Sequence, residues 1–249
     1  MIDKKKIDIL SIFDEPIVYK ELKLYPIMVK DYMKFYSCID CLQVRKNNSA
    51  DINIIKMSYL EFILSHIKKD SVEFNKEENN EAIFHKFIVL MVLVFKLNEE
   101  TVLQDGTFKI GTNSIMINEI KINSTMFDDI RNIIFQQNYV IFDDNLSIDM
   151  QMLIQKHESM EANSDVDLED SILDVALASN MSMKDIFNLT LRKFNKLRKK
   201  IAKKINYDTY ASISAQNGHT MEIWTGHESN DPDYSKYFGT TLEKGKKRL

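Results

Sequence analysis

The spacing of apolar residues changes near Val29, and this change predicts a short β-hairpin followed by a helix. Residues 17–27, IVYKELKLYPI, alternate apolar and polar side chains, as a half-buried strand does. The alternation separates two sets of residues: Val18, Lys20, Leu22 and Leu24 against Tyr19, Glu21 and Lys23. Beyond Val29 the apolar residues recur every three or four positions, which is typical of a helix.

Helical spacing dominates the rest of the first 180 residues. Four segments follow one another, 55–69, 82–97, 124–138 and 168–180, and helical spacing is present in all of them except 82–97. The run FIVLMVLVF within the second segment indicates a buried helix or strand, because it has about half the length of a membrane span. We expect the third segment to begin at Ser124 or Thr125, since Asp128 follows Thr125 at capping-box spacing. Residues 107–122 predict a small hairpin with GTNS as its turn.

A basic amphipathic helix is expected from residue 181 onward, with Ser182 as its N-cap and Asp185 at the third position. Eight of the thirteen residues from Arg192 to Lys204 are Lys or Arg. Apolar and small residues form one stripe at helical spacing: Phe187, Thr190, Phe194, Leu197, Ile201 and Ile205.

These elements predict a mainly α protein with one or two small β-hairpins and a flexible C-terminal tail. The chain has only six Gly and three Pro among 249 residues, which favours helices over a barrel of many strands. We expect four parts: a helical domain with hairpins at 1–155, an acidic connector with a short helix at 156–180, the basic helix at 181–210 and an extended tail at 211–249.

The residues that carry chemistry do not converge on a reaction. Cys38 and Cys41 form the sequence CIDC, but they fall late in an expected helix rather than at a helix start after a strand, so a structural role is favoured over a redox one. His219 and His227 match no standard metal spacing. No phosphate-binding, hydrolase or metalloprotease motif occurs. We therefore expect no enzyme activity, no cofactor and no metal. The low cysteine content suits a reducing cytoplasm.

The basic helix has three interpretations. It could bind nucleic acid through phosphate contacts, lie on an anionic membrane, or pair with an acidic segment. The segment 157–183 contains seven acidic residues and no Lys or Arg. The net charge of the chain is −4, so we favour acidic pairing, within one molecule or across a dimer. The expected partner-binding residues are the apolar Phe187, Phe194, Leu197 and Ile201 and the basic Arg192, Lys196, Lys199 and Lys203.

Three stretches resemble tail-region proteins of phages and prophages of low-GC Gram-positive bacteria: ELKLYPIMVKDYMKF at 21–35, FDDIRNIIFQQNYVIFDD at 127–144 and MSMKDIFNLTLRKFNKL at 181–197. The resemblance covers roughly residues 15–205 and leaves the tail after 210 unmatched. It implies a non-enzymatic, chaperone-like protein that binds the tape-measure protein or another tail protein in the host cytoplasm.

The resemblance leaves two alternatives open. One is a structural component of the virion tail or baseplate hub, and the other is a nucleic-acid-binding protein that uses the basic stretch 192–204. The partners that it implies are tape-measure, tube or baseplate-hub proteins, together with self-association. Membrane binding is not expected.

Overall fold

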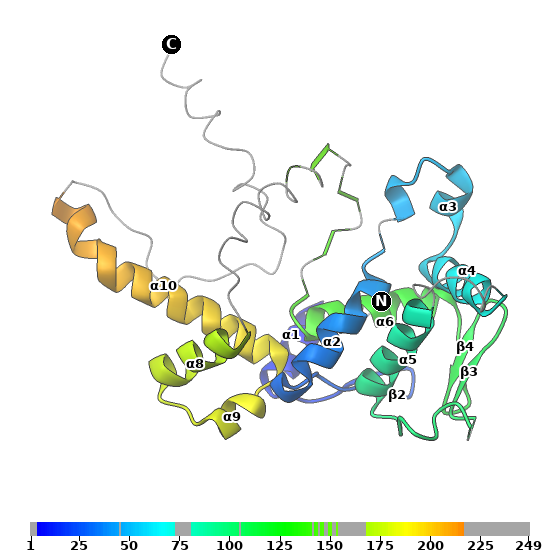
Figure 1. Cartoon of the computed structure of the whole chain (residues 1–249), viewed down its shortest axis with the longest axis horizontal. Helices are drawn as coiled ribbons and strands as arrows, with labels where there is room; N and C mark the ends of the chain where they lie inside the picture. Colours follow the sequence, from blue (N-terminus) through cyan, green and yellow to red (C-terminus); the bar gives the residue numbers. More distant parts are fainter. Residues whose placement is uncertain are drawn as a thin grey trace, which may run out of the picture.

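The computed structural model describes residues 4–44, 46–72, 81–104, 106–140, 142–143, 145–146, 149–150, 153 and 168–216. These residues form a mainly helical protein with a two-stranded and a three-stranded antiparallel sheet, which confirms the predicted fold class (Figure 1). Most of the expected acidic connector, the expected tail after 216 and the candidate metal residues His219 and His227 lie outside the described residues.

The chain begins with α1 (Lys4–Ile12) and the hairpin of β1 (Ile17–Tyr19) and β2 (Leu22–Leu24). Lys20 and Glu21 make the turn with φ angles of 45° and 71°, as a tight two-residue hairpin turn requires. Tyr19 therefore pairs with Leu22 on the buried face, whereas Val18 is 56% exposed. The predicted division of faces was wrong at Val18, because the alternation does not continue through the turn.

Six helical segments follow the hairpin. They are η1 (Val29–Asp31), α2 (Tyr32–Cys38), η2 (Ile39–Leu42), η3 (Lys46–Asn48), α3 (Ile52–Lys56) and α4 (Tyr59–Val72). The helix expected over 55–69 is divided, because Ser58 starts α4 with a capping box. The Ser58 hydroxyl accepts from the Glu61 N–H at 3.1 Å, and the Glu61 carboxylate accepts from the Ser58 N–H at 2.8 Å.

The apolar run of the sequence forms α5 (Glu81–Phe95). The predicted second hairpin is a three-stranded sheet of β3 (Phe108–Ile110), β4 (Ile115–Ile117) and β5 (Ile120–Ile122). The third strand was missed because its turn consists of Asn118 and Glu119, whose φ angles are 49° and 67°. The N-cap of α6 (Ser124–Gln137) is Asn123, whose side-chain oxygen accepts a hydrogen bond from the Met126 N–H. The predicted caps Ser124 and Thr125 were therefore wrong.

The C-terminal part contains α8 (Leu168–Ser179), α9 (Met183–Phe187) and α10 (Leu191–Gln216). Ser182 caps α9 as predicted, through a hydrogen bond from the Asp185 N–H. The single helix expected over 181–210 was wrong: it is broken between α9 and α10, and α10 continues to Gln216.

The break between α9 and α10 has a tertiary cause. The Val29 N–H donates to the Leu189 carbonyl at 2.9 Å, and the Leu191 N–H donates to the Ile27 carbonyl at 2.8 Å. These bonds form an isolated antiparallel bridge between Met28 and Thr190. A backbone that pairs in this way is extended and cannot continue a helix.

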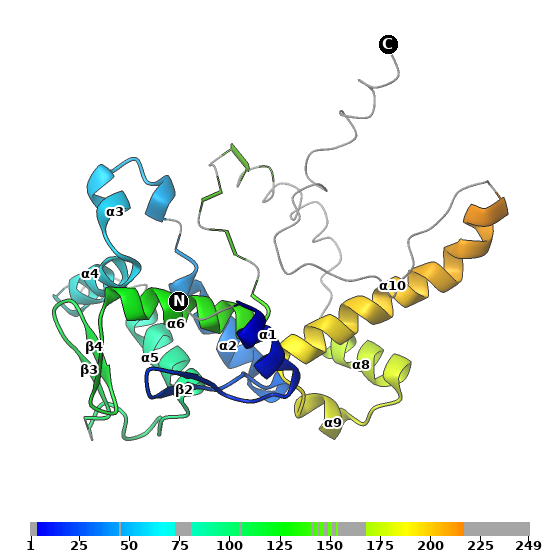
Figure 2. The same ribbon diagram turned by 180° about the vertical axis from the view of Figure 1, so that it is seen from behind.

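One apolar core joins residues from both ends of the chain. Phe35, Phe87, Phe127 and Phe194 are each at most 1% exposed and belong to the same cluster. Seen from behind, α1 lies against α6 and next to the start of α10 (Figure 2). The start of α10 is therefore part of the body of the protein.

Candidate partner-binding site

The first turns of α10 are firmly held in the body. Phe194 and Leu191 are fully buried, and Thr190 is 1% exposed. The Thr190 hydroxyl donates to a carboxylate oxygen of Asp14 at 3.1 Å, and Lys193 forms an ion pair with the other oxygen at 2.5 Å. Phe194, expected to bind a partner, is instead a core residue.

Arg192 is an anchor rather than a surface cation. Its side chain is 4% exposed and donates to the Asp8 carboxylate at 2.6 Å and to the Gln136 carbonyl at 2.5 Å. A buried guanidinium needs such partners, because an unpaired buried charge is strongly destabilising. Arg192 therefore ties α10 to α1 and α6, and it is not available to an external partner.

The ion pairs at the base of α10 differ from those expected. Arg192 and Lys193 pair with Asp8 and Asp14, at the other end of the sequence, rather than with the acidic segment that precedes α9. The contact of α8 with α10 includes buried Ile172 and Val175 and a hydrogen bond from Arg198 to the Ser171 hydroxyl at 3.1 Å. Apolar packing and a neutral hydrogen-bond acceptor are therefore part of this contact.

The four apolar residues proposed for binding do not form one stripe. Leu197 and Ile201 are half-buried against the core next to Phe194. Phe187 ends α9 and is 39% exposed. The break at Thr190 removes Phe187 from the helix that carries the other three.

Several basic residues of α10 lie on one face of the helix. Tyr139 lies beside this face near the start of the helix. Lys199 donates to the Tyr139 hydroxyl at 3.2 Å and stands 4.8 Å from its ring centroid, while Lys196 stands 5.8 Å from it. Contacts of this kind stabilise a cation next to an aromatic face. Lys203 is exposed one turn further along.

Two tyrosines extend this basic face and were not singled out from the sequence. Lys199, Lys203, Tyr207 and Tyr210 are separated by four, four and three residues, so they share one side of α10. Tyr210 is 51% exposed and Tyr207 is half-buried. The same spacing rule that found the apolar stripe could have found this face.

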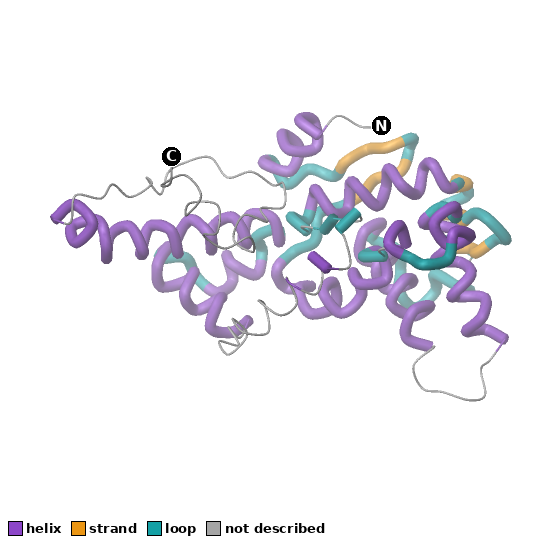
Figure 3. The backbone as a smooth tube through the Cα atoms, turned by 90° about the horizontal axis from the view of Figure 1, so that it is seen from above, coloured by secondary structure: helices purple, strands orange, loops and turns teal. Residues whose placement is uncertain are grey.

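The end of α10 forms an arm, which we define as residues 203–216. The arm extends past α8 and beyond the other described elements in all three views (Figures 1, 2 and 3). Its exposed residues include Lys203, Lys204 and Ile205, the last at 57%. A helix that is anchored by a buried Phe and Arg, and that carries exposed side chains beyond its anchor, can present them to another molecule.

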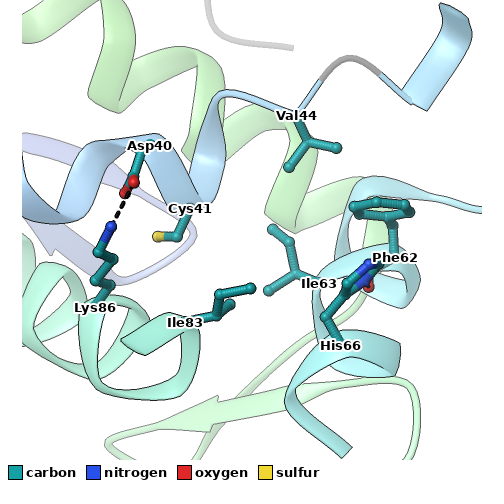
Figure 4. Close-up of a pocket in the computed structure, with 8 residues that line it drawn as sticks. All are labelled: Asp40, Cys41, Val44, Phe62, Ile63, His66, Ile83 and Lys86. Atoms are coloured by element: carbon teal, nitrogen blue, oxygen red, sulfur yellow. Dashed lines mark hydrogen bonds and ion pairs between the residues drawn. The ribbon is translucent and has the colours of Figure 1, made fainter. Parts of the chain in front are cut away.

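A pocket of about 170 Å³ lies between η2, α4 and α5 (Figure 4). Its walls are mostly apolar, and its polar groups are Cys41, His66 and the ion pair of Lys86 with Asp40 at 2.5 Å. His66 Nδ1 lies 2.8 Å from the Phe62 carbonyl oxygen, a local contact within α4.

The two cysteines are poor candidates for chemistry. Cys38 and Cys41 are 4% and 8% exposed, and burial raises the pKa of both thiols. A protonated thiol is a weak nucleophile and a weak metal ligand. Among the described residues there is no group of three His, Cys, Asp or Glu side chains that could hold a metal ion.

Within the part of the chain that the structure describes, no helix combines the length and the apolar character that crossing a membrane requires. Comparison of the chain with protein families, with curated proteins and with solved structures finds no match.

Proposed function

We propose that this protein is a non-enzymatic assembly protein of a phage tail, and that the arm of α10 binds an α-helical tail protein in the host cytoplasm. The observation that carries the proposal is the arm itself. The helix that carries it is fixed at its base by Phe194 and Arg192, and the arm carries the exposed Lys203, Lys204 and Tyr210. The sequence resemblance to tail-region proteins supplies the class of partner.

The chemistry of the arm favours a helical partner with acidic residues. Lys203 attracts carboxylates, and Tyr207 and Tyr210 add aromatic surface on the same side of α10. Two helices can pack side by side along such a stripe, with interfacial aromatic residues contributing much of the binding energy. The tape-measure protein is the first candidate that the resemblance implies, because a long helical chain needs protection before the tube forms around it.

A binding role is also favoured over catalysis by the state of the nucleophiles. The thiols in and next to the pocket are buried, with raised pKa values. The lysine at the pocket is held by Asp40. A catalytic site needs a nucleophile and a base within hydrogen-bond reach of each other, and this arrangement does not supply one.

The test is co-expression with the tape-measure protein from the same genome. The wild-type chain should keep that protein soluble and co-purify with it. The double variant Lys203→Glu/Tyr210→Ala should lose co-purification and keep its thermal unfolding temperature, because both side chains are exposed. The matched control Lys23→Glu/Tyr25→Ala changes a Lys and a Tyr in and beside the first hairpin. Equal loss of binding in both variants would refute the arm as the binding site.

Mass spectrometry of purified particles separates a transient chaperone from the alternative of a tail or baseplate-hub component. A transient chaperone is absent from finished virions, whereas a structural component is present in fixed stoichiometry.

The alternation of Lys and Tyr on α10 also fits single-stranded nucleic acid, whose phosphates and bases attract cations and aromatic rings. The assay is binding of mixed single-stranded DNA at about 50 and 200 mM salt, where phosphate contacts weaken steeply. We expect weak binding. Tight, salt-dependent binding that disappears in the variant Lys199→Gln/Lys200→Gln/Lys203→Gln would replace the protein-binding proposal.

A further inference from the structure

A second surface of the molecule, on α8, complements the arm. Its residues lie on one side of α8 at helical spacing: Asp170, Leu173, Asp174 and Leu177. We call this the acidic face of α8. All four side chains are exposed, with Leu173 at 42% and Leu177 at 83%.

Helix α9 also carries exposed apolar residues. It packs beside α8 (Figure 1), and its Met183 and Phe187 are 38% and 39% exposed. Lys184 and Asp185, between them in sequence, are exposed as well. Exposed apolar side chains on neighbouring helices are typical of an interaction site.

The arm of the same molecule is not the occupant of this face. The side of α8 that packs in the body carries Ser171, Ile172 and Val175, which are all buried, and Ser171 accepts from Arg198 of α10. The acidic face lies on the opposite side of α8, because its residues fall about half a helical turn away from these three. The arm of the same molecule therefore does not cover this face, whereas the arm of another molecule can reach it.

We infer that the acidic face of α8 binds the arm of a second copy of this chain. The two surfaces agree in charge and in length. The arm carries Lys203, Tyr207 and Tyr210, and beside them Lys204, which forms an exposed ion pair with Asp208 at 2.5 Å; the acidic face of α8 offers two Asp and two Leu. Each stripe spans eight helical residues, and its first and last residues are about 10 Å apart along the helix axis.

Each molecule carries both halves of this contact, and we infer a closed pair in which two copies related by a twofold axis exchange their arms. A closed pair of this kind is the commonest symmetry of soluble oligomers. The pairing uses acidic residues of one chain and basic residues of the other, and is therefore weakened by salt.

Sedimentation velocity of the full purified chain tests the inference without any tail protein, so its result is separate from the proposed function. At about 50 mM salt the wild-type chain should dimerise, and at about 500 mM salt its dimer should weaken by roughly tenfold or more. A wild-type chain that stays monomeric at the lower salt would overturn the inference.

Charge reversal identifies the two surfaces. The variant Asp170→Lys/Asp174→Lys and the variant Lys203→Glu/Lys204→Glu should each be monomeric, because like charges then meet. An equimolar mixture of the two should dimerise again, since both contacts regain opposite charges. The controls Glu21→Lys/Glu100→Lys and Lys23→Glu/Lys121→Glu make equal charge changes at exposed sites elsewhere and should dimerise like the wild type.

The remaining outcomes contradict the inference. A dimer that persists in either reversed variant means that another surface joins the copies, such as the exposed Ile9, Ile12 and Phe13 of α1. A mixture that fails to dimerise means that the two surfaces do not meet. Circular dichroism of each variant checks that α8 and α10 remain helical.

Discussion

Phe194 and Phe187 belong to the same apolar pattern in the sequence, but they differ in burial in the structure. Phe194 is fully buried in the core, whereas Phe187 is 39% exposed at the end of α9. Replacing a buried Phe with Ala removes its burial energy and leaves a cavity, at a cost of about 3–5 kcal/mol. The same change at Phe187 should cost about 1 kcal/mol or less, since much of that ring already contacts water.

The assay is equilibrium unfolding in urea, followed by circular dichroism. With a slope of about 2 kcal/mol/M, Phe194→Ala should lower the midpoint by roughly 1.5–2.5 M and Phe187→Ala by roughly 0.5 M or less. Phe194→Leu is the intermediate control, because it keeps most of the apolar volume. Equal midpoint shifts for the two Ala variants would refute the division of the helix at Thr190 and the packing derived from it.

Three further predictions address buried polar and ionisable groups. Arg192→Ala should cost about 1–3 kcal/mol in the same assay, because the Gln136 carbonyl loses its donor, whereas the Asp8 carboxylate is 37% exposed and stays in contact with water. Burial and the hydrogen bond that its hydroxyl donates to Asp129 raise the pKa of Tyr19 to about 12. The folded state therefore keeps this proton above pH 10, where the unfolded chain releases it. The free energy of unfolding should therefore fall by on the order of 2 kcal/mol as the pH rises from 10 to 12. The variant Tyr19→Phe, measured by urea unfolding at pH 9 and 11.5, should lack this part of the fall. Cys38 and Cys41 should react with a thiol reagent only as fast as the protein opens, and rapid labelling of the native chain would contradict their burial.

Much of the fold follows from local pattern. The period of apolar residues predicted α6 and α8, and the period of two predicted the hairpin of β1 and β2, whereas the apolar run of α5 was compatible with a buried helix or strand. The N-cap at Ser182 was also predicted, because a hydroxyl that accepts from an N–H three residues later is a local interaction. Such features depend on neighbours in the sequence, so the sequence alone determines them.

The base of the candidate site depended on tertiary contacts. The pattern from 181 to 205 is compatible with one continuous helix, and only the bridge between Met28 and Thr190 breaks it. In the sequence Arg192 cannot be distinguished from the other seven cations of this stretch. Only the fold brings Asp8 within 2.6 Å of it. No local rule identifies a partner that lies 184 positions away in the chain.

The residues available for binding were thus decided by the tertiary structure rather than by composition. The sequence by itself determined that α10 is basic, amphipathic and helical. The packing of its first turns against α1, α6 and α8 determined that Arg192 and Phe194 are internal, while Lys203 and Tyr210 face outward. The physical reason is that burial depends on which surfaces meet, and these surfaces come from opposite ends of the chain.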